Sequence, residues 1–264
     1  MISKESLLRI PELNLAGRVT DMTDVQFNGY VLTLNTFIDR FPAQADKMRD
    51  ATDDKDYIAL SRTLTEVCVV LKQLYADKMA KECDKRINVL KSASIKGVDH
   101  DEVESFVEQF IQTVSALSID IQMAAHSSRV SAQPRPRPAT AQIYNRNQPL
   151  ILAVDNAVMF LNTMKKLLKD APYDLHTTTS CADALDYLQS SRPDIFLLDI
   201  EMPEMDGYEL ARRIKNSGQK APIIFITANS AREYVDKAVE VGAAGLLMKP
   251  LRVNQLLAKL KEFV

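Results

Sequence analysis

The sequence predicts a multidomain protein in which an all-α up-and-down helical bundle precedes an α/β domain with a doubly wound parallel sheet. Three observations support this prediction. The length of 264 residues fits two domains at roughly 150 residues each. Apolar residues recur at spacings of three and four before residue 127, but they gather in short unbroken runs after residue 148. A proline- and arginine-containing segment separates the two patterns.

The first 126 residues read as helical throughout and predict four or five amphipathic helices. One apolar stripe runs from Tyr30 to Met48, and we expect Pro42 within it to end one helix and start the next. Further stripes cover residues 60–74, 79–90 and 103–121. Asp99 is a suitable N-cap for the last helix. Short polar turns between these helices would give an up-and-down bundle.

Residues 127–148 predict a flexible linker. Prolines and arginines alternate within it over residues 134–138. Each proline disfavours helix for the residue before it, so an extended or disordered segment is expected. A proline-rich ligand for a partner domain, or an electrostatic contact through Arg135 and Arg137, stays open as an alternative. The predicted domains are therefore residues 1–126, the linker 127–148, and residues 149–264.

Short apolar runs after the linker predict a parallel sheet. They cover residues 150–154, 195–198, 223–226 and 246–248, with a weaker strand expected at 175–178. Runs of this kind, alternating with amphipathic helical stretches, are typical of strands buried on both faces of the sheet. The functional site of such a domain lies at the carboxyl ends of its strands.

Four polar residues fall at those strand ends and predict a phosphate-and-metal pocket. Asp155, Asp199 and Thr227 end three of the runs, and Lys249 follows the last. Two carboxylates packed together favour a hard cation such as Mg²⁺. The lysine and the hydroxyl could then hold phosphoryl oxygens, which is the arrangement that phosphoryl transfer needs. Asp199 is the candidate nucleophile, forming an aspartyl phosphate.

The segments ILAVDN, FLLDIEMPEMDG, IIFITA and GAAGLLMKP resemble the receiver domain of bacterial response regulators, a CheY-like, flavodoxin-like (βα)5 fold. The resemblance covers about residues 149–264. It implies that Asp199 is the phosphoacceptor, Thr227 the switch hydroxyl and Lys249 the phosphate-binding lysine. It also implies a Mg²⁺ site in which Asp155, Asp199 and the backbone carbonyl of Glu201 are ligands.

Two positions depart from the receiver pattern. Asn156 stands where receivers usually carry a second acidic residue; its amide oxygen can still bind Mg²⁺. The missing charge is worth roughly 1 to 4 kcal/mol at ~4 Å, so metal affinity could fall about tenfold or more. Leu246 stands where receivers usually place an aromatic residue that turns inward on activation. The output is therefore expected to run through the helix at residues 231–241 by a different packing change, or to be lost.

The segments IPELNLAGRV and TFIDRFPAQADKMRDATDDKDYIALSRTL resemble a histidine-phosphotransfer (HPt) domain. The alignment puts Thr65 at the phosphorylated histidine of that family, Cys68 at the following lysine and Val69 at the following glycine. A threonine hydroxyl without an adjacent base is a poor substitute for imidazole. The resemblance therefore implies a degenerate HPt-like bundle that binds partners. Phosphate on His126 would be the sign of the alternative, an active phosphodonor.

Composition narrows the class of protein. The 33 Lys+Arg and 35 Asp+Glu give a net charge of −2, which argues against a general nucleic-acid or membrane-surface binder. No signal-peptide h-region and no run of about 20 apolar residues is found in the sequence. Three cysteines without metal-ligand spacing, two of them (Cys68 and Cys83) expected in the bundle core, are typical of buried thiols in a cytoplasmic protein.

The sequence thus predicts a two-component phosphorelay protein that is not an enzyme beyond assisting its own phosphorylation and dephosphorylation. A histidine kinase, an HPt protein or a small phosphodonor would supply the phosphoryl group, and the bundle would bind other signalling proteins. A homodimer stays open. The first alternative is a scaffold in which neither domain handles phosphate. A hydrolase with an aspartyl nucleophile, with Glu201 as its second carboxylate, is disfavoured by the MPEMDG segment and the Lys249–Pro250 pair.

Overall fold

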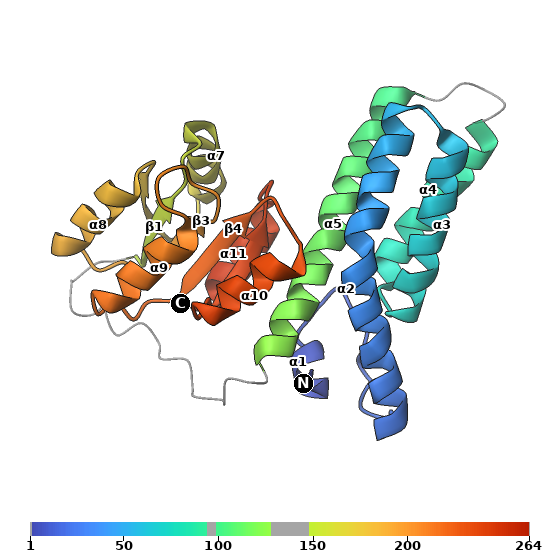
Figure 1. The fold of residues 1–264 in the computed structure, drawn as a ribbon, viewed down its shortest axis with the longest axis horizontal. Helices are drawn as coiled ribbons and strands as arrows, with labels where there is room; N and C mark the ends of the chain where they lie inside the picture. Colours follow the sequence, from blue (N-terminus) through green and yellow to red (C-terminus); the bar gives the residue numbers. More distant parts are fainter. Residues whose placement is uncertain (1, 94–98, 128–147, 264) are drawn as a thin grey trace. The chain divides into compact units, whose positions relative to one another are not determined.

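The computed structural model describes residues 2–93, 99–127 and 148–263. It divides into two compact units, a helical one that contains helices α1 to α5 and an α/β one that contains strands β1 to β5 (Figure 1). Most of the predicted linker, residues 128–147, lies outside the described residues.

Four long helices lie side by side in the helical unit (Figure 1). Helix α2 packs against α3 and α5, and α3 packs against α4. Residues with left-handed backbone, Lys55 and Tyr75, close α2 and α3 and allow the chain to reverse within three-residue turns. A short helix, α1, precedes them. The bounds are α1 Lys4–Leu7, α2 Asp24–Asp53, α3 Tyr57–Gln73, α4 Asp77–Ala93 and α5 His100–Ser127.

The expected helix break at Pro42 was wrong, because α2 runs through the proline without interruption. Phe41 and Met48, on either side of it, are fully buried, as is Leu34 one turn before Ile38. A continuous apolar stripe on one straight helix keeps all of these side chains in the core. Their burial offsets the lost hydrogen bond and the crowding of the proline ring, which cost about 3 kcal/mol in a helix interior.

The segment between α1 and α2 also departs from the expectation of helix throughout. Residues 8–23 form turns, and most of their backbone hydrogen bonds are short-range, as from Ile10 N–H to the Leu7 carbonyl; Asn14 N–H, however, donates to the distant Tyr75 carbonyl at 2.9 Å. Pro11 and Gly17, the latter with φ +73°, interrupt helix here. The apolar side chains of this segment still join the core of the helical unit, which buries Ile10, Leu13, Leu15 and Val19.

The N-cap prediction for the last helix was confirmed. Asp99 Oδ1 accepts hydrogen bonds from the backbone N–H groups of Asp101, at 3.1 Å, and Glu102, at 3.4 Å. These donors would otherwise lack a partner at the start of α5.

The α/β unit contains a five-stranded parallel sheet with the strand order β2-β1-β3-β4-β5. All five expected strands are present. Strands β1, β3 and β4 are buried along their whole length, whereas β2, the weak prediction, is a half-exposed edge strand. The strands are β1 Leu150–Val154, β2 Asp174–Thr178, β3 Ile195–Asp199, β4 Ile223–Thr227 and β5 Gly245–Met248.

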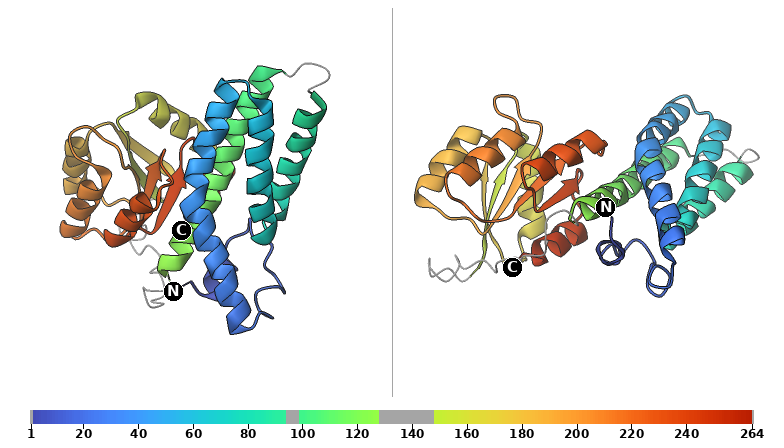
Figure 2. Two further views of the ribbon diagram at one scale, coloured as in Figure 1. Left: turned by 45° about the vertical axis from the view of Figure 1, so that its right-hand side comes forward. Right: turned by 60° about the horizontal axis from the view of Figure 1, so that its bottom comes forward.

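Helices cover both faces of this sheet (Figure 2). One face packs against α7 and α11 through a core that includes Leu161, Met164, Leu256 and Leu260. The other face carries α8, α9 and α10, with Tyr208 of α9 against Phe225 of β4. The helices are α7 Val158–Leu168, α8 Cys181–Ser190, α9 Gly207–Asn216, α10 Arg232–Glu240 and α11 Val253–Lys261. None of the described helices is long and apolar enough to cross a bilayer.

Candidate functional site

The carboxyl ends of β1, β3 and β5 bring together three of the predicted site residues. Lys249 Nζ lies 2.7 Å from Asp155 Oδ2 and 3.0 Å from Asp199 Oδ1. The two carboxylates are almost completely buried, with 1% and 4% of their side chains exposed. These three residues therefore lie close together, as predicted, since the carboxyl ends of parallel strands all lie at the same edge of their sheet.

The electrostatics of this cluster follow from its burial. Burial raises the pKa of the Asp199 carboxyl, and the nearby Asp155 charge adds to the rise. Lys249 and the backbone N–H of Glu201 hydrogen-bond to that carboxyl and work in the opposite direction. Burial works to lower the pKa of Lys249, but the two carboxylates outweigh it and leave the pKa raised. The amine also lies 4.6 Å from the centre of the Phe160 ring, a cation–π contact that helps to orient it.

The donor set at this edge fits a Mg²⁺ ion. Asp155 Oδ1 accepts a hydrogen bond from the Ala157 N–H at 2.8 Å. Its Oδ2 is buried and is paired with Lys249 Nζ at 2.7 Å. A buried carboxylate oxygen that faces a positive charge is also a suitable ligand for a hard cation. The described residues contain no cluster of three His, Cys, Asp or Glu, so Asn156 and the Glu201 carbonyl would have to complete the ligands.

Thr227 is fully buried at the end of β4, on the same edge of the sheet. Its hydroxyl is turned toward its own loop. It donates to the Asn229 carbonyl at 3.2 Å and accepts from the Asn229 N–H at 3.0 Å. The predicted switch hydroxyl thus lies in the pocket but bonds to the β4–α10 loop.

The loop after β3 shows why the MPEMDG segment has its particular residues. Asp206 is the N-cap of α9 and accepts the Glu209 N–H at 2.7 Å. Gly207 donates its N–H to the Ile200 carbonyl at 3.0 Å, and a Cβ at this glycine would overlap the Asp199 carbonyl. Glycine therefore lets α9 begin directly against the end of β3.

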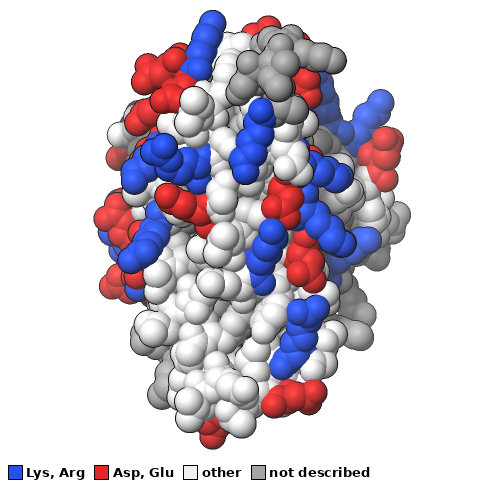
Figure 3. All heavy atoms as spheres, turned by 90° about the vertical axis from the view of Figure 1, so that its right-hand side faces the viewer, with Lys and Arg blue, Asp and Glu red and all other residues white. Residues whose placement is uncertain are grey.

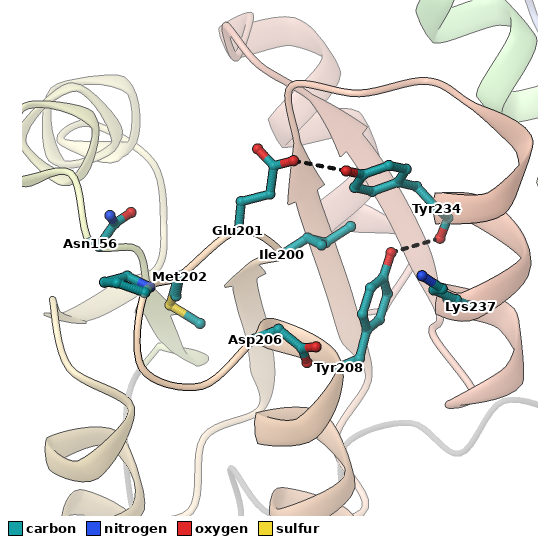
Figure 4. Close-up of a pocket in the computed structure, with 9 residues that line it drawn as sticks. Asn156, Ile200, Glu201, Met202, Asp206, Tyr208, Tyr234 and Lys237 are labelled. Atoms are coloured by element: carbon teal, nitrogen blue, oxygen red, sulfur yellow. Dashed lines mark hydrogen bonds between the residues drawn. The ribbon is translucent and has the colours of Figure 1, made fainter.

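A surface pocket of about 480 Å³ adjoins the cluster (Figure 4). Tyr234 of α10 donates its hydroxyl to Glu201 Oε1 at 3.0 Å, and Tyr208 donates its hydroxyl to the Tyr234 carbonyl at 2.9 Å. The pocket is lined by Asn156, Ile200, Glu201, Met202, Pro203, Asp206, Tyr208, Tyr234 and Lys237.

Phe160, Tyr208 and Tyr234 were not predicted as site residues from the sequence. Phe160 could have been found from its place on the first turn of the helix after Asp155. The tyrosines carry no comparable signal, because their contacts join separate elements. Leu246, by contrast, lies where it was expected, in β5, and is 2% exposed.

The three positions singled out in the helical unit lie on α3. Thr65 is exposed, and its hydroxyl donates to the Ser61 carbonyl of its own helix at 2.7 Å. Val69 is half exposed, whereas Cys68 is buried and its thiol donates to Asp84 Oδ1 at 3.1 Å. Cys68 and Cys83 are both buried, as predicted, and burial raises the pKa of each thiol.

The side of the molecule on the right of Figure 1 mixes charges of both signs in its upper part, where α3 and α4 lie (Figure 3). Its lower part, where α2 begins, is mainly uncharged.

Comparisons with known proteins bear on the α/β unit. The family model of the response regulator receiver domain matches residues 151–261. Response regulator MprA of Mycobacterium avium and that of Mycobacterium tuberculosis are each 31% identical over 114 residues, which is 43% of this chain and 50% of the relative. The chain thus spans about half the length of the curated relatives it matches. Chemotaxis protein CheY4 of Vibrio cholerae is 29% identical over 44% of this chain and 99% of its own, with a TM-score of 0.43.

Residues 151–261 are a response regulator receiver domain. Receiver domains belong to two-component signalling systems, in which they interact with kinases or other phosphodonors. The matched residues do not include the helical unit, so the resemblance of that unit to an HPt domain stays a prediction.

Proposed function

We propose that this protein is a two-component phosphorelay protein in which the receiver accepts a phosphoryl group on Asp199 and thereby controls protein–protein interactions. The observation that carries the proposal is the contact of one lysine with two buried carboxylates, Asp155 and Asp199, at the strand ends. The two-unit organisation, with the described helical unit as a partner-binding module, is part of the same proposal.

In the proposed reaction a carboxylate oxygen of Asp199 attacks the phosphorus of the donor. A new P–O bond forms, the bond from phosphorus to the donor breaks, and the donor leaves with that electron pair. Lys249 then neutralises an oxygen of the transferred group, for which it gives up part of its contact with Asp199. The Thr227 hydroxyl turns from the Asn229 carbonyl to donate to another of those oxygens.

We propose that Mg²⁺ is held by Asp155, Asp199, the Glu201 carbonyl and the Asn156 amide. When bound, it supplies positive charge for the phosphoryl oxygens. Asp155 and Asn156 keep that charge beside Asp199, and burial of both carboxylates excludes the water that would screen it. The protein assists its own phosphorylation in this way without turning over a separate substrate.

The test is incubation with Mg²⁺ and acetyl phosphate, followed by intact-protein mass spectrometry. Wild type is expected to gain the mass of one phosphoryl group, and Asp199→Asn is expected to gain none. Asp170→Asn, a substitution of an exposed aspartate, is the matched control and should behave as wild type. A chain that gains no mass with acetyl phosphate or with a phosphorylated histidine donor would refute the proposal.

We propose that the helical unit recognises signalling partners without transferring phosphate. The Thr65 hydroxyl, at the position predicted to replace a histidine, already donates to a carbonyl of its own helix. A hydroxyl so engaged, with no adjacent base to activate it, is a weak nucleophile. The expected result is that acid-labile phosphate is found on none of the histidines, including His126, when a phosphorylated receiver is supplied.

A second candidate function is a scaffold whose receiver is not phosphorylated. Asn156 favours it, because this position lacks the charge of a second acidic residue. The same incubation separates the two candidates, since a scaffold would gain no phosphoryl mass either as wild type or as Asp199→Asn.

A further inference from the structure

Two routes join Tyr234 of α10 to the phosphoryl pocket. The first route runs through Glu201. Glu201 is the second residue after Asp199, and its side chain accepts the Tyr234 hydroxyl at 3.0 Å. A change at Asp199 therefore reaches Tyr234 through Glu201.

The second route runs through Asn229. The Thr227 hydroxyl donates to the Asn229 carbonyl at 3.2 Å and accepts the Asn229 N–H at 3.0 Å. Asn229 belongs to the loop between β4 and α10, the helix in which Tyr234 lies. The hydroxyl that would turn toward a phosphoryl group thus holds the backbone of the segment that leads to Tyr234.

Tyr234 is firmly joined to the rest of the α/β unit through its backbone. Tyr208 donates its hydroxyl to the Tyr234 carbonyl at 2.9 Å (Figure 4). Tyr208 is itself 6% exposed, and its ring packs 5.1 Å from the Phe225 ring of β4. Because this carbonyl belongs to α10, a displacement of Tyr234 is a displacement of the helix.

Strand β5 has no aromatic side chain that could transmit phosphorylation in place of Tyr234. Leu246 is buried at 2% exposure and has no hydroxyl that could exchange partners. Its register partner on β4 is Phe225, the residue on which Tyr208 packs.

We propose that Tyr234 is the switch residue of this receiver: its hydroxyl responds to phosphorylation of Asp199 through Glu201, its backbone follows the loop at Asn229, and both pass the change to α10. This inference rests on the proposed function. Phosphorylation draws the Thr227 hydroxyl away from the Asn229 carbonyl and adds negative charge two residues before Glu201, the partner of the Tyr234 hydroxyl. Glu201 and the loop at Asn229 then shift, and the first turns of α10 loosen.

The test is amide hydrogen exchange of the full chain with and without Mg²⁺ and beryllofluoride, a phosphoryl mimic. In wild type, exchange of the α10 amides is expected to rise about fivefold with the mimic, the change that one hydrogen bond of ordinary net strength produces. In Tyr234→Phe, α10 is expected to exchange faster without the mimic, and the mimic is expected to add less than about twofold. Glu201→Gln should lie between these variants.

The ratio of exchange with and without the mimic separates switching from mere support of the fold. A residue that only stabilises α10 would change both states equally and leave the ratio at the wild-type value. Tyr187→Phe, in α8, is the matched control, because the ring of Tyr187 stacks on His176 and the variant removes only a hydroxyl. It should keep the wild-type ratio.

Phosphorylation is measured on the same samples with acetyl phosphate. If Tyr234→Phe gains the phosphoryl mass and keeps the wild-type ratio, the inference is overturned and the proposed function stands. If wild type neither gains mass nor responds to beryllofluoride, both fail together.

Discussion

At the scale of single residues, the pocket combines two buried carboxylates with a lysine but holds an amide where a third acidic group is usual. Lys249 offsets one of the two negative charges of Asp155 and Asp199, and Asn156 adds none. A cation entering this site therefore meets less attraction than it would beside three carboxylates. A substitution at position 156 should accordingly change the metal affinity more than any other single substitution at the pocket rim.

Asn156→Asp is expected to tighten Mg²⁺ binding about tenfold, since one added charge at ~4 Å is worth roughly 1 to 4 kcal/mol. Isothermal titration calorimetry measures the effect directly. The control is Asn216→Asp, which adds the same charge to the last turn of α9. Equal affinities of wild type and Asn156→Asp would mean that this position does not border a cation.

At the scale of elements, the start of α9 depends on a close backbone approach. Gly207→Ala is expected to destabilise the α/β unit by about 1 to 3 kcal/mol, because the new Cβ would overlap the Asp199 carbonyl. Urea unfolding should show a lower midpoint at unchanged slope. Gly29→Ala is the control: a Cβ there meets no atom within 4 Å, and alanine is the better helix former. A Gly207→Ala variant as stable as wild type would show that the loop can shift to admit the Cβ without a loss in the free energy of unfolding.

The end of α10 is capped from α9. Lys215 Nζ donates to the carbonyls of Val241 and Gly242, both at 2.6 Å. Burial lowers the pKa of this lysine below its ordinary value. Between the lowered and the ordinary pKa the unfolded chain binds more protons than the folded chain, so the stability of wild type should rise with pH in that alkaline window.

Lys215→Met is expected to lose about 1 to 2 kcal/mol of stability through the two hydrogen bonds and to lack this rise. The free energies of unfolding, measured from neutral pH to just below the ordinary lysine pKa, should therefore diverge as the pH increases. Lys220→Met, which removes an exposed lysine, should follow the wild-type pH dependence. A constant difference between Lys215→Met and wild type would contradict the assigned burial.

At the scale of the whole molecule, each unit contains its own apolar core. Helices α2 to α5 supply most of the first core, and the sheet with α7 and α11 supplies the second. Residues 1–127 and residues 148–264, produced separately, are each expected to unfold cooperatively on heating. Circular dichroism at a helix band checks this, and a fragment that loses its signal without a transition would show that its core depends on the other.

The positions of the sheet and of the pocket were predictable from the sequence. Unbroken apolar runs mark strands buried on both faces, and parallel strands must end at a common edge, so Asp155, Asp199 and Lys249 could be placed together from their order alone. The N-cap at Asp99 was also predictable from the sequence, since its side chain accepts hydrogen bonds from residues only two and three positions later.

Only the tertiary structure decided the rest. Pro42 stays inside α2 because burial on both sides outweighs a local preference, and the Thr227 hydroxyl bonds to Asn229 because of how its loop folds. The hydrogen bond between Glu201 and Tyr234 joins the loop after β3 to α10, 33 positions further along the chain. Spacing along the chain determines which side chains share a face of a helix or strand. Contacts between elements depend on how those elements pack, and no local sequence pattern specifies that packing.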